Sequence, residues 1–255
     1  MFALNIAVIT GASSGIGREY ALEVSRTREA VDEIWLIARR EDKLRETAES
    51  ISKKVRILPL DLTKEDALNE YSNLLLSLKP NVLTLINNAG FGKLGDFDRT
   101  SPEDSTGMVR LNCEALTAVT SLILPFMASG AEIINVSSIA AFAPNTRMAV
   151  YCSTKAYVFS FSLALRSELK KRGINVLAAC PGPMDTEFLP TAGITPGASH
   201  TFDTLPRVNP SVMARKSLEA SKKKKGVYTN LLFYKLYRII AKILPHSLVM
   251  KICGA

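Results

Sequence analysis

Short apolar runs rich in β-branched residues recur along this chain, and longer amphipathic stretches separate them. Several runs are apolar at nearly every position, which is typical of strands that helices cover on both faces. We expect strands at Asn5–Thr10, Glu33–Ala38, Val55–Pro59, Val82–Asn87, Glu132–Ser137 and Asn175–Cys180, and helices at 15–29, 41–52, 64–78, 102–128 and 149–172. This alternation predicts an α/β protein, a single-domain Rossmann fold whose doubly wound parallel sheet has about seven strands flanked by helices.

The length of 255 residues is ample for one α/β domain with a sizeable core, and no internal repeat divides the chain. We expect residues 1–190 to form a Rossmann core that binds a nucleotide and carries catalysis. Residues 187–212 contain prolines and glycines that do not fit a long regular element, and they predict a substrate loop within the same domain. Residues 213–255 form a basic, amphipathic C-terminal region.

Cysteine and histidine usage argues against metal chemistry, because the chain has two histidines and its four cysteines show no CxxC spacing. We expect reduced thiols at Cys113, Cys152, Cys180 and Cys253, and no metal site. The N-terminus lacks the basic flank of a secretory signal, and no window approaches about 18 uninterrupted apolar residues. These features predict a cytoplasmic protein.

The net charge of +8 arises at the end of the chain. From Arg207 onward there are eleven Lys or Arg and one acid, Glu219, which gives +10 and leaves −2 for the rest. The basic balance therefore says little about the main domain. Nucleic-acid binding is not expected, since no recognition module accompanies the charge.

A glycine-rich turn, Thr10-Gly11-Ala12-Ser13-Ser14-Gly15-Ile16-Gly17, joins the first predicted strand to a predicted helix. A tight turn, close approach of backbone to phosphate and close helix–strand packing each favour glycine. The helix N-terminus then offers free N–H groups to a pyrophosphate. The spacing differs from GxGxxG, but the strand–turn–helix context predicts a dinucleotide site.

Two arginines, Arg39 and Arg40, follow the second predicted strand. An NAD-selective site usually offers an acid at this point to the ribose 2′-hydroxyl, whereas the 2′-phosphate of NADP calls for arginine. No acid ends this strand. We expect NADP(H), with Arg39 as the main phosphate ligand and Arg40 as its neighbour; the alternative is a solvated charge pair where a helix starts.

The motifs along residues 3–190 resemble, in their order, those of the classical short-chain dehydrogenase/reductase family. Thr10–Gly17 is similar to the family's TGxxxGxG turn, and 87–90 (Asn-Asn-Ala-Gly) matches its NNAG motif. Tyr151-x3-Lys155 matches YxxxK, and Pro181-Gly182 follows the sixth predicted strand, as in the family. The resemblance implies an oxidoreductase that transfers a hydride between NADP(H) and a ketone or secondary alcohol.

The resemblance also implies the cofactor contacts. Asp61 and Leu62 are similar to the adenine-contacting segment, and 181–186 resembles the PG-x3-T segment that passes over the nicotinamide, with Thr186 on its carboxamide. The expected cofactor-binding set is Gly11, Ser13, Ser14, Gly15, Ile16, Gly17, Arg39, Arg40, Asp61, Leu62, Asn88, Ala89, Gly90, Tyr151, Lys155, Pro181, Gly182, Met184 and Thr186.

Tyr151 and Lys155 are four residues apart, so a helix places them on one face. A free tyrosine has a pKa of about 10, and a nearby ammonium is expected to lower it towards neutrality. The resemblance implies that Tyr151 transfers the proton and that Lys155 also holds the nicotinamide ribose. It implies further that Ser138, rather than Ser137, binds the substrate oxygen, and that Asn112 holds a water in a proton relay.

The substrate is less constrained than the reaction. By analogy with the family, the pocket is expected to use Ser138 and the largely apolar set Phe91, Leu94, Ala140, Phe142, Met148, Met184 and Phe188. Such a lining favours a small hydrophobic molecule, namely a bulky ketone or alcohol such as a steroid, a bile acid or a long-chain ketone. Among relatives in the family, residues 38–40 and the apolar C-terminal segment most resemble the corresponding segments of hydroxysteroid dehydrogenases and long-chain ketone reductases.

The C-terminal segment predicts an amphipathic helix that ends or kinks at Pro245. Its apolar positions are Leu232, Phe233, Leu236, Ile239, Ile240 and Ile243, and its basic positions are Lys235, Arg238 and Lys242. Three interpretations remain open. The apolar face closes the pocket or packs in a dimer, or residues 222–252 make peripheral contact with an anionic membrane, or the charges are merely solvated.

Other functions are compatible with the same fold. A nucleotide-sensing regulator without catalysis could lack the tyrosine or the lysine, and this chain retains both. A reductase of small xenobiotic carbonyls is another alternative. Dehydration or epimerisation is more typical of longer, extended relatives. Resemblance to the family also leads us to expect a homodimer or homotetramer.

Overall fold

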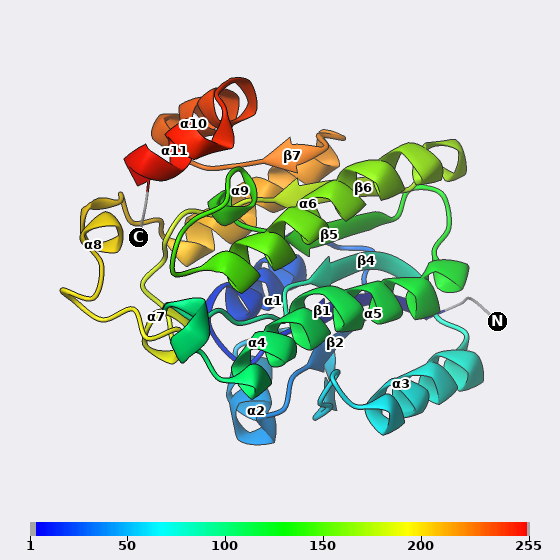
Figure 1. Cartoon of the computed structure of the whole chain (residues 1–255). Helices are drawn as coiled ribbons and strands as arrows, with labels where there is room; N and C mark the ends of the chain where they lie inside the picture. The colour runs from blue at the N-terminus through cyan, green and yellow to red at the C-terminus, as the bar shows by residue number, and fades with distance from the viewer. Residues whose placement is uncertain (1–3, 254–255) are drawn as a thin grey trace.

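The computed structural model describes residues 4–253, which contain one seven-stranded sheet in which all neighbouring strands are parallel (Figure 1). The strand order is β3-β2-β1-β4-β5-β6-β7. The strands are β1 (Asn5–Thr10), β2 (Glu33–Ile37), β3 (Lys54–Leu58), β4 (Asn81–Asn87), β5 (Glu132–Val136), β6 (Asn175–Ala179) and β7 (Val227–Tyr228). The predicted doubly wound parallel sheet is confirmed.

Eleven α-helices occur among the described residues. They are α1 (Gly15–Thr27), α2 (Glu41–Glu49), α3 (Glu65–Leu78), α4 (Pro102–Val109), α5 (Leu116–Ile123), α6 (Ala149–Leu169), α7 (Phe188–Thr191), α8 (His200–Thr204), α9 (Pro210–Lys222), α10 (Leu232–Ile243) and α11 (His246–Cys253). A π-helical segment, η2 (Arg110–Ala115), joins α4 to α5. Short 3-10 turns lie at Phe97–Arg99, Leu124–Phe126, Ile139–Ala141 and Lys170–Arg172.

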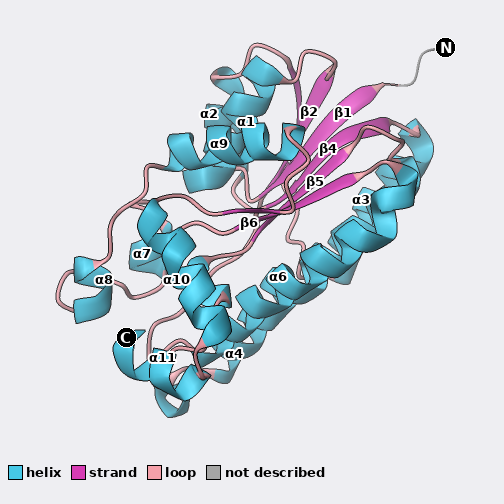
Figure 2. Cartoon of the chain, turned by 90° about the horizontal axis from the view of Figure 1, so that it is seen from above, coloured by secondary structure: helices cyan, strands magenta, loops and turns pink. Residues whose placement is uncertain are grey.

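The helices cover both faces of the sheet (Figure 2). α1, α2 and α9 pack on one face, while α3, α5 and α6 pack on the other. Strand β1 shows why the sequence specifies this arrangement, since successive side chains of a strand point to opposite faces. Ala7 and Ile9 belong to the first core, and Ile6 and Val8 belong to the second.

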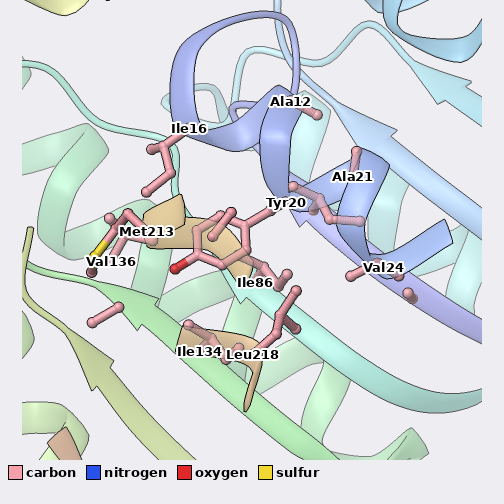
Figure 3. Close-up of a cluster of buried hydrophobic side chains, with 14 of the residues drawn as sticks. Ala12, Ile16, Tyr20, Ala21, Val24, Ile86, Ile134, Val136, Met213 and Leu218 are labelled. Atoms are coloured by element: carbon pink, nitrogen blue, oxygen red, sulfur yellow. The ribbon is translucent and has the colours of Figure 1, made fainter. Parts of the chain in front are cut away.

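Tyr20 of α1 lies in the first core, among side chains that include those of β4, β5 and α9 (Figure 3). Its ring is fully buried, and its hydroxyl shares a 2.6 Å hydrogen bond with the Ser217 hydroxyl of α9. A buried phenol needs such a partner, because an unpaired hydroxyl there would cost about 1–3 kcal/mol. This bond links α9 to α1.

Most predicted elements are observed, with four differences, the first being that helix α9 (Pro210–Lys222) was not among the predicted helices. The helix predicted at 102–128 is divided by η2, and the irregular segment after β6 contains the short helices α7 and α8. β7 was not predicted, because its two residues are too few to show a periodic pattern. Residues 1–3 and 254–255, the ends of the predicted core and C-terminal region, lie outside the described residues.

One helical stretch among the described residues, Pro102–Phe126, has the length and composition of a membrane span. Its α5 part packs against the sheet, where Val119 and Ile123 are fully buried in the second core. Packing within the domain therefore uses part of this apolar surface, since 39% of the span-like window is buried. Three of the cysteines, at 113, 152 and 180, are free thiols, and the side chain of Cys253 lies outside the described residues.

Candidate active site and nucleotide cleft

A cavity of about 750 Å³ opens at the carboxyl ends of the strands. It is lined by the loops after β1 and β4, the two neighbouring strands from which the sheet grows in opposite directions. Open α/β sheets bind ligands at this switch point, because the loops after the two strands diverge there. The same cavity continues past β5 and β6 to the substrate loop and to α10.

The glycines of the turn after β1 are required by close contacts. Gly11 has φ +66°, and a Cβ there would lie 2.8 Å from Asn88 Nδ2. A Cβ on Gly17 would overlap the carbonyl of Gly11, so Gly17 lets α1 approach the turn and does not itself line the cavity. Asn88 holds the turn by donating from Nδ2 to the carbonyls of Thr10 at 3.1 Å and Gly11 at 3.0 Å.

Helix α1 begins at Gly15 with its N-terminus open to the cavity. Ser14 stands at the N-cap but its side chain makes no capping hydrogen bond. The first backbone N–H groups of α1 therefore remain available to an anion, and the helix dipole favours negative charge there. Ser13, Ser14, Gly15 and Ile16 all line the cavity at this point.

The two arginines after β2 have different environments, although both line the cavity. Arg40 forms a 2.6 Å ion pair with Glu187 and also donates to the hydroxyls of Ser14 at 3.1 Å and Ser13 at 3.4 Å. Arg39 makes no hydrogen bond or ion pair to any described residue; its charge helps to lower the pKa of Asp61. Burial is the largest single influence and raises the pKa of Asp61, but the two hydrogen bonds from Thr63 together with the charges of Arg39 and Lys64 bring it below its usual value.

Ser138 lies in the loop that follows β5, and Tyr151 and Lys155 lie on α6; all three line the same cavity. The Ser138 side chain lies near enough to the Tyr151 hydroxyl to counteract part of the rise in the Tyr151 pKa. Lys155 Nζ lies 5.8 Å from the centroid of the Tyr151 ring and donates at 2.9 Å to the carbonyl of Val136. Ser137 instead donates to the carbonyl of Lys155 at 2.8 Å, which leaves Ser138 as the serine that meets Tyr151.

Burial controls the pKa values of this pair. It raises the pKa of Tyr151 well above its usual value, although the nearby Ser138 side chain acts in the opposite direction. Burial also lowers the pKa of Lys155 to about 8. The expectation that Lys155 brings the Tyr151 pKa towards neutrality does not hold for the protein without a cofactor, because burial of the phenol raises that pKa.

Asn112 lies on the π-helical segment η2, where one extra residue per turn displaces its side chain from the regular helical position. Its Oδ1 accepts from Phe91 N at 3.0 Å, and its Nδ2 donates to Phe91 O at 2.9 Å and to Thr154 Oγ1 at 3.0 Å. Both amide hydrogens are thus engaged. The side chain holds the loop after β4 against α6, and Asn112 does not line the cavity.

The segment after β6 is held by α10. The ring of Tyr234 packs directly on Gly182, where a Cβ would lie 2.7 Å from Tyr234 Cζ. The Tyr234 hydroxyl donates at 2.7 Å to the carbonyl of Pro206. Pro181, Gly182, Met184 and Thr186 all line the cavity, as does Tyr234 itself. The C-terminal helix therefore fixes the wall of the cavity above the strand ends.

Most predicted site residues are collected around this one cavity. The cofactor set lines it except for Gly17, and of the substrate set Phe91, Ala140, Met148, Met184, Phe188 and Ser138 line it. Leu94 and Phe142 do not line it. Leu94 packs beside the cavity wall. The Phe142 ring makes an edge-to-face contact with Phe159 and a tilted contact with Tyr237.

Several lining residues were missed by sequence reasoning. They come from the substrate loop and from α10: His200, Thr201, Phe202, Leu205, Phe233, Tyr234 and Tyr237. Aromatic residues after β6 were the available signal, but nothing in their spacing shows which of them face the cavity. Cys152, next to Tyr151, also lines it and is buried.

The cleft fits a nicotinamide dinucleotide on its own geometry. The glycine turn leaves room that a Cβ would fill, an uncapped helix N-terminus faces the cavity, and two guanidinium groups lie at its adenosine end. The sequence profile described as short chain dehydrogenase matches residues 5–195. The chain belongs to the short-chain dehydrogenase family.

Similar proteins of known name include sulfoacetaldehyde reductase 2 of Chromohalobacter salexigens, 35% identical over 193 residues, which covers 72% of this chain and 74% of that protein. The very-long-chain 3-oxoacyl-CoA reductase of Rattus norvegicus is 32% identical over 189 residues, covering 69% of this chain and 58% of the rat protein. A probable oxidoreductase of Mycobacterium tuberculosis is 31% identical, but the match spans only 33% of its length.

Two solved structures cover nearly the whole chain. A short-chain dehydrogenase from Sphingobium yanoikuyae in complex with NADPH has a TM-score of 0.79 and 27% identity, covering 96% of this chain and 98% of that one. The bulky-bulky ketone specific alcohol dehydrogenase from Comamonas testosteroni has a TM-score of 0.75 and 26% identity, covering 98% and 95%. The family assignment therefore extends to the complete architecture.

As a short-chain dehydrogenase, the protein is an oxidoreductase that acts on alcohol and ketone groups with a nicotinamide cofactor. A bound nicotinamide would supply or accept the hydride. The Ser138 hydroxyl and the Tyr151 phenol, whose pKa is raised by burial, both line the cavity, where a serine can orient a carbonyl and a protonated phenol can donate to a developing alkoxide. Lys155, fixed by the Val136 carbonyl, places positive charge behind the tyrosine ring.

Proposed function

We propose that this protein is an NADPH-dependent reductase of bulky hydrophobic ketones. The observation that carries the proposal is the continuity of the cavity. One volume joins Arg39 and Arg40 at one end to Ser138 and Tyr151 at the other, among apolar and aromatic side chains.

The phosphate-binding half of the proposal is supported by the environment of Arg39. Its guanidinium carries a full charge, lines the cavity and is not engaged by any described acid in an ion pair, so it can bind a 2′-phosphate without first breaking another contact. Arg40, in contrast, is already paired with Glu187. NADPH in the Sphingobium relative agrees with this choice of cofactor.

The substrate half is supported by the composition and size of the catalytic end. Phe91, Met148 and Phe188 lie near Tyr151, and the rings of Tyr151 and Phe188 are 5.6 Å apart. Phe202 and Leu205 add further apolar surface from the substrate loop. Such surface gains affinity from a large apolar substrate and little from a small polar one. A steroid, a bile acid or a long-chain ketone has suitable chemistry.

A kinetic panel tests the proposal. Oxidation of NADPH and of NADH is followed with a steroid ketone, a long-chain aliphatic ketone and acetone. We expect the highest kcat/KM with NADPH and a bulky ketone. Preference for acetone would refute the substrate half, and preference for NADH would refute the cofactor half; absence of turnover with every ketone would favour a nucleotide-sensing role instead.

A further inference from the structure

Helix α10 has one face that fixes it to the protein. Tyr234 and Ala241, seven residues apart, are buried, and Tyr237 lies between them in the sequence. The Tyr234 ring packs on Gly182, and the Tyr237 ring lies 6.0 Å from that of Phe142. α10 lies at the outside of the molecule (Figure 1), and Phe233, Tyr234 and Tyr237 from it line the catalytic cavity.

The opposite face of α10 is apolar and exposed. Leu232, Leu236, Ile239 and Ile243 follow the spacing i, i+4, i+7, i+11, which places them in one line along the helix. Their exposed fractions are 71%, 51%, 56% and 74%. Phe233 and Ile240 are also exposed and widen this face. We call these six residues the outer stripe of α10.

The outer stripe differs from an ordinary surface helix. A helix that packs on a domain normally buries its apolar stripe and presents polar residues to water. α10 instead buries Tyr234 and Ala241, half-buries Tyr237, and presents leucine and isoleucine outward. A contiguous exposed apolar face of this kind marks an interaction surface.

Cations border the outer stripe on one side. Lys235 and Lys242 are exposed and seven residues apart, and Arg238 lies between them with its guanidinium 5.9 Å from the Phe159 ring. From residue 226 to 253 the chain contains no Asp or Glu, and α11 adds Lys251. The surface around the outer stripe is therefore complementary to an anionic partner.

Charge distinguishes between two partners that could cover the outer stripe, a second copy of this chain and a lipid bilayer. A second copy of the chain docked on this face would bring the same lysines against Lys235 and Lys242, with no acid in the segment to pair with them. An anionic bilayer offers acyl chains to the outer stripe and phosphates to the lysines. We propose that α10 lies in the surface of an anionic lipid membrane, parallel to its plane.

This placement has a consequence for the substrate, which rests on the proposed function. Phe233 belongs both to the outer stripe and to the cavity lining. A docked α10 therefore sets one wall of the cavity against the lipid. A bulky apolar ketone dissolved in the bilayer then reaches Tyr151 without crossing water.

Vesicle sedimentation tests the membrane contact. Full-length protein is mixed with vesicles of phosphatidylcholine or of equimolar phosphatidylcholine and phosphatidylglycerol. We expect binding to the anionic vesicles that weakens with added salt. The double variant Lys235→Ala/Lys242→Ala should bind on the order of 30-fold more weakly, since each lysine near such a surface contributes about 1 kcal/mol. Leu236→Glu/Ile239→Glu should lose at least about 100-fold.

Leu76→Glu is the matched control. Leu76 is 58% exposed on α3, at the far side of the molecule from α10 (Figures 1 and 2). Its replacement makes the Leu→Glu change of Leu236→Glu once, without touching the outer stripe, so vesicle binding should equal that of the wild type. Circular dichroism and thermal unfolding confirm that each variant is folded, and turnover of a water-soluble ketone should be unchanged in all of them.

Two outcomes would overturn the proposal. One is wild-type protein that stays in the supernatant with anionic vesicles, or a Leu236→Glu/Ile239→Glu variant that sediments as well as the wild type. The other is a change of assembly size, measured by light scattering, caused by Leu236→Glu/Ile239→Glu in a protein that ignores vesicles; the stripe would then join copies of the chain. Either result leaves the ketone panel untouched, so failure here is distinguishable from failure of the proposed reductase activity.

Discussion

Replacing Arg39 by glutamate is the most direct test of how the cleft selects its cofactor. Arg39 lines the adenosine end of the cavity and lacks a hydrogen-bonding or ion-pair partner among the described residues. A charge-assisted contact between its guanidinium and a 2′-phosphate contributes about 1.5–3 kcal/mol. Reversing the charge removes this contact and adds repulsion of about 1 kcal/mol at an exposed site.

The sum predicts a loss on the order of 100-fold in kcat/KM for NADPH. NADH lacks the phosphate, so its kcat/KM should change only a few-fold. The measurement is steady-state kinetics of Arg39→Glu and wild type with both cofactors and one ketone. An unchanged NADPH-to-NADH ratio would refute the reasoning. Equal losses with both cofactors would also refute it, since Arg39 would then bind a part that the two cofactors share.

Lys43→Glu provides the control for long-range electrostatics. Lys43 lies on α2, four residues after Arg39, pairs with Glu46 and does not line the cavity. The variant changes the net charge by the same amount without removing a predicted phosphate contact. Its NADPH-to-NADH ratio should stay within a few-fold of the wild-type value, and a shift as large as that of Arg39→Glu would show a field effect instead of direct binding.

Three further predictions concern catalysis and stability. Tyr151→Phe should abolish nearly all turnover while NADPH binding, followed by cofactor fluorescence, persists; retained turnover would exclude Tyr151 as proton donor. Lys155 has a pKa lowered to about 8 from 10.5, so its burial cost is fully present below pH 8 and is lost as pH rises to 10.5. Wild type should therefore gain stability relative to Lys155→Met over this window in denaturant titrations, and a constant difference would contradict the shift. Gly182→Ala forces a Cβ against Tyr234 and should cost about 1–3 kcal/mol of unfolding free energy. Tyr234→Leu in the same chain should relieve part of that cost in a double-mutant cycle, and strict additivity would argue against the contact.

The sequence by itself determined the α/β architecture and which residues follow each strand to form the site. Alternating apolar runs and amphipathic stretches predicted β1–β6 because helix and strand periodicities are local properties of the chain. The glycine turn, Ser138, Tyr151 and Lys155 followed, since parallel strands bring the residues after their carboxyl ends to one edge of the sheet. Motif order and sheet topology together were enough to predict one shared cleft.

Only the tertiary structure decided the burial, the contacts and the pKa values of the predicted site residues. Periodicity does not reveal desolvation, so burial of Tyr151 and its raised pKa were not predictable from the nearby lysine. Likewise, the shift produced by η2 turns Asn112 into a clamp on Phe91, and packing of Phe142 on Phe159 removes it from the cavity. These outcomes depend on contacts between residues far apart in the chain.

The C-terminal helix illustrates the same division. Its sequence predicted an amphipathic helix but left open which side the protein would bury. Packing chose Tyr234 and Ala241, because the tyrosine ring fits over Gly182 and its hydroxyl reaches the Pro206 carbonyl. The leucines and isoleucines were thereby turned outward. The direction of an apolar face is settled by the shape and polar groups of the surface that receives the helix, which no local pattern contains.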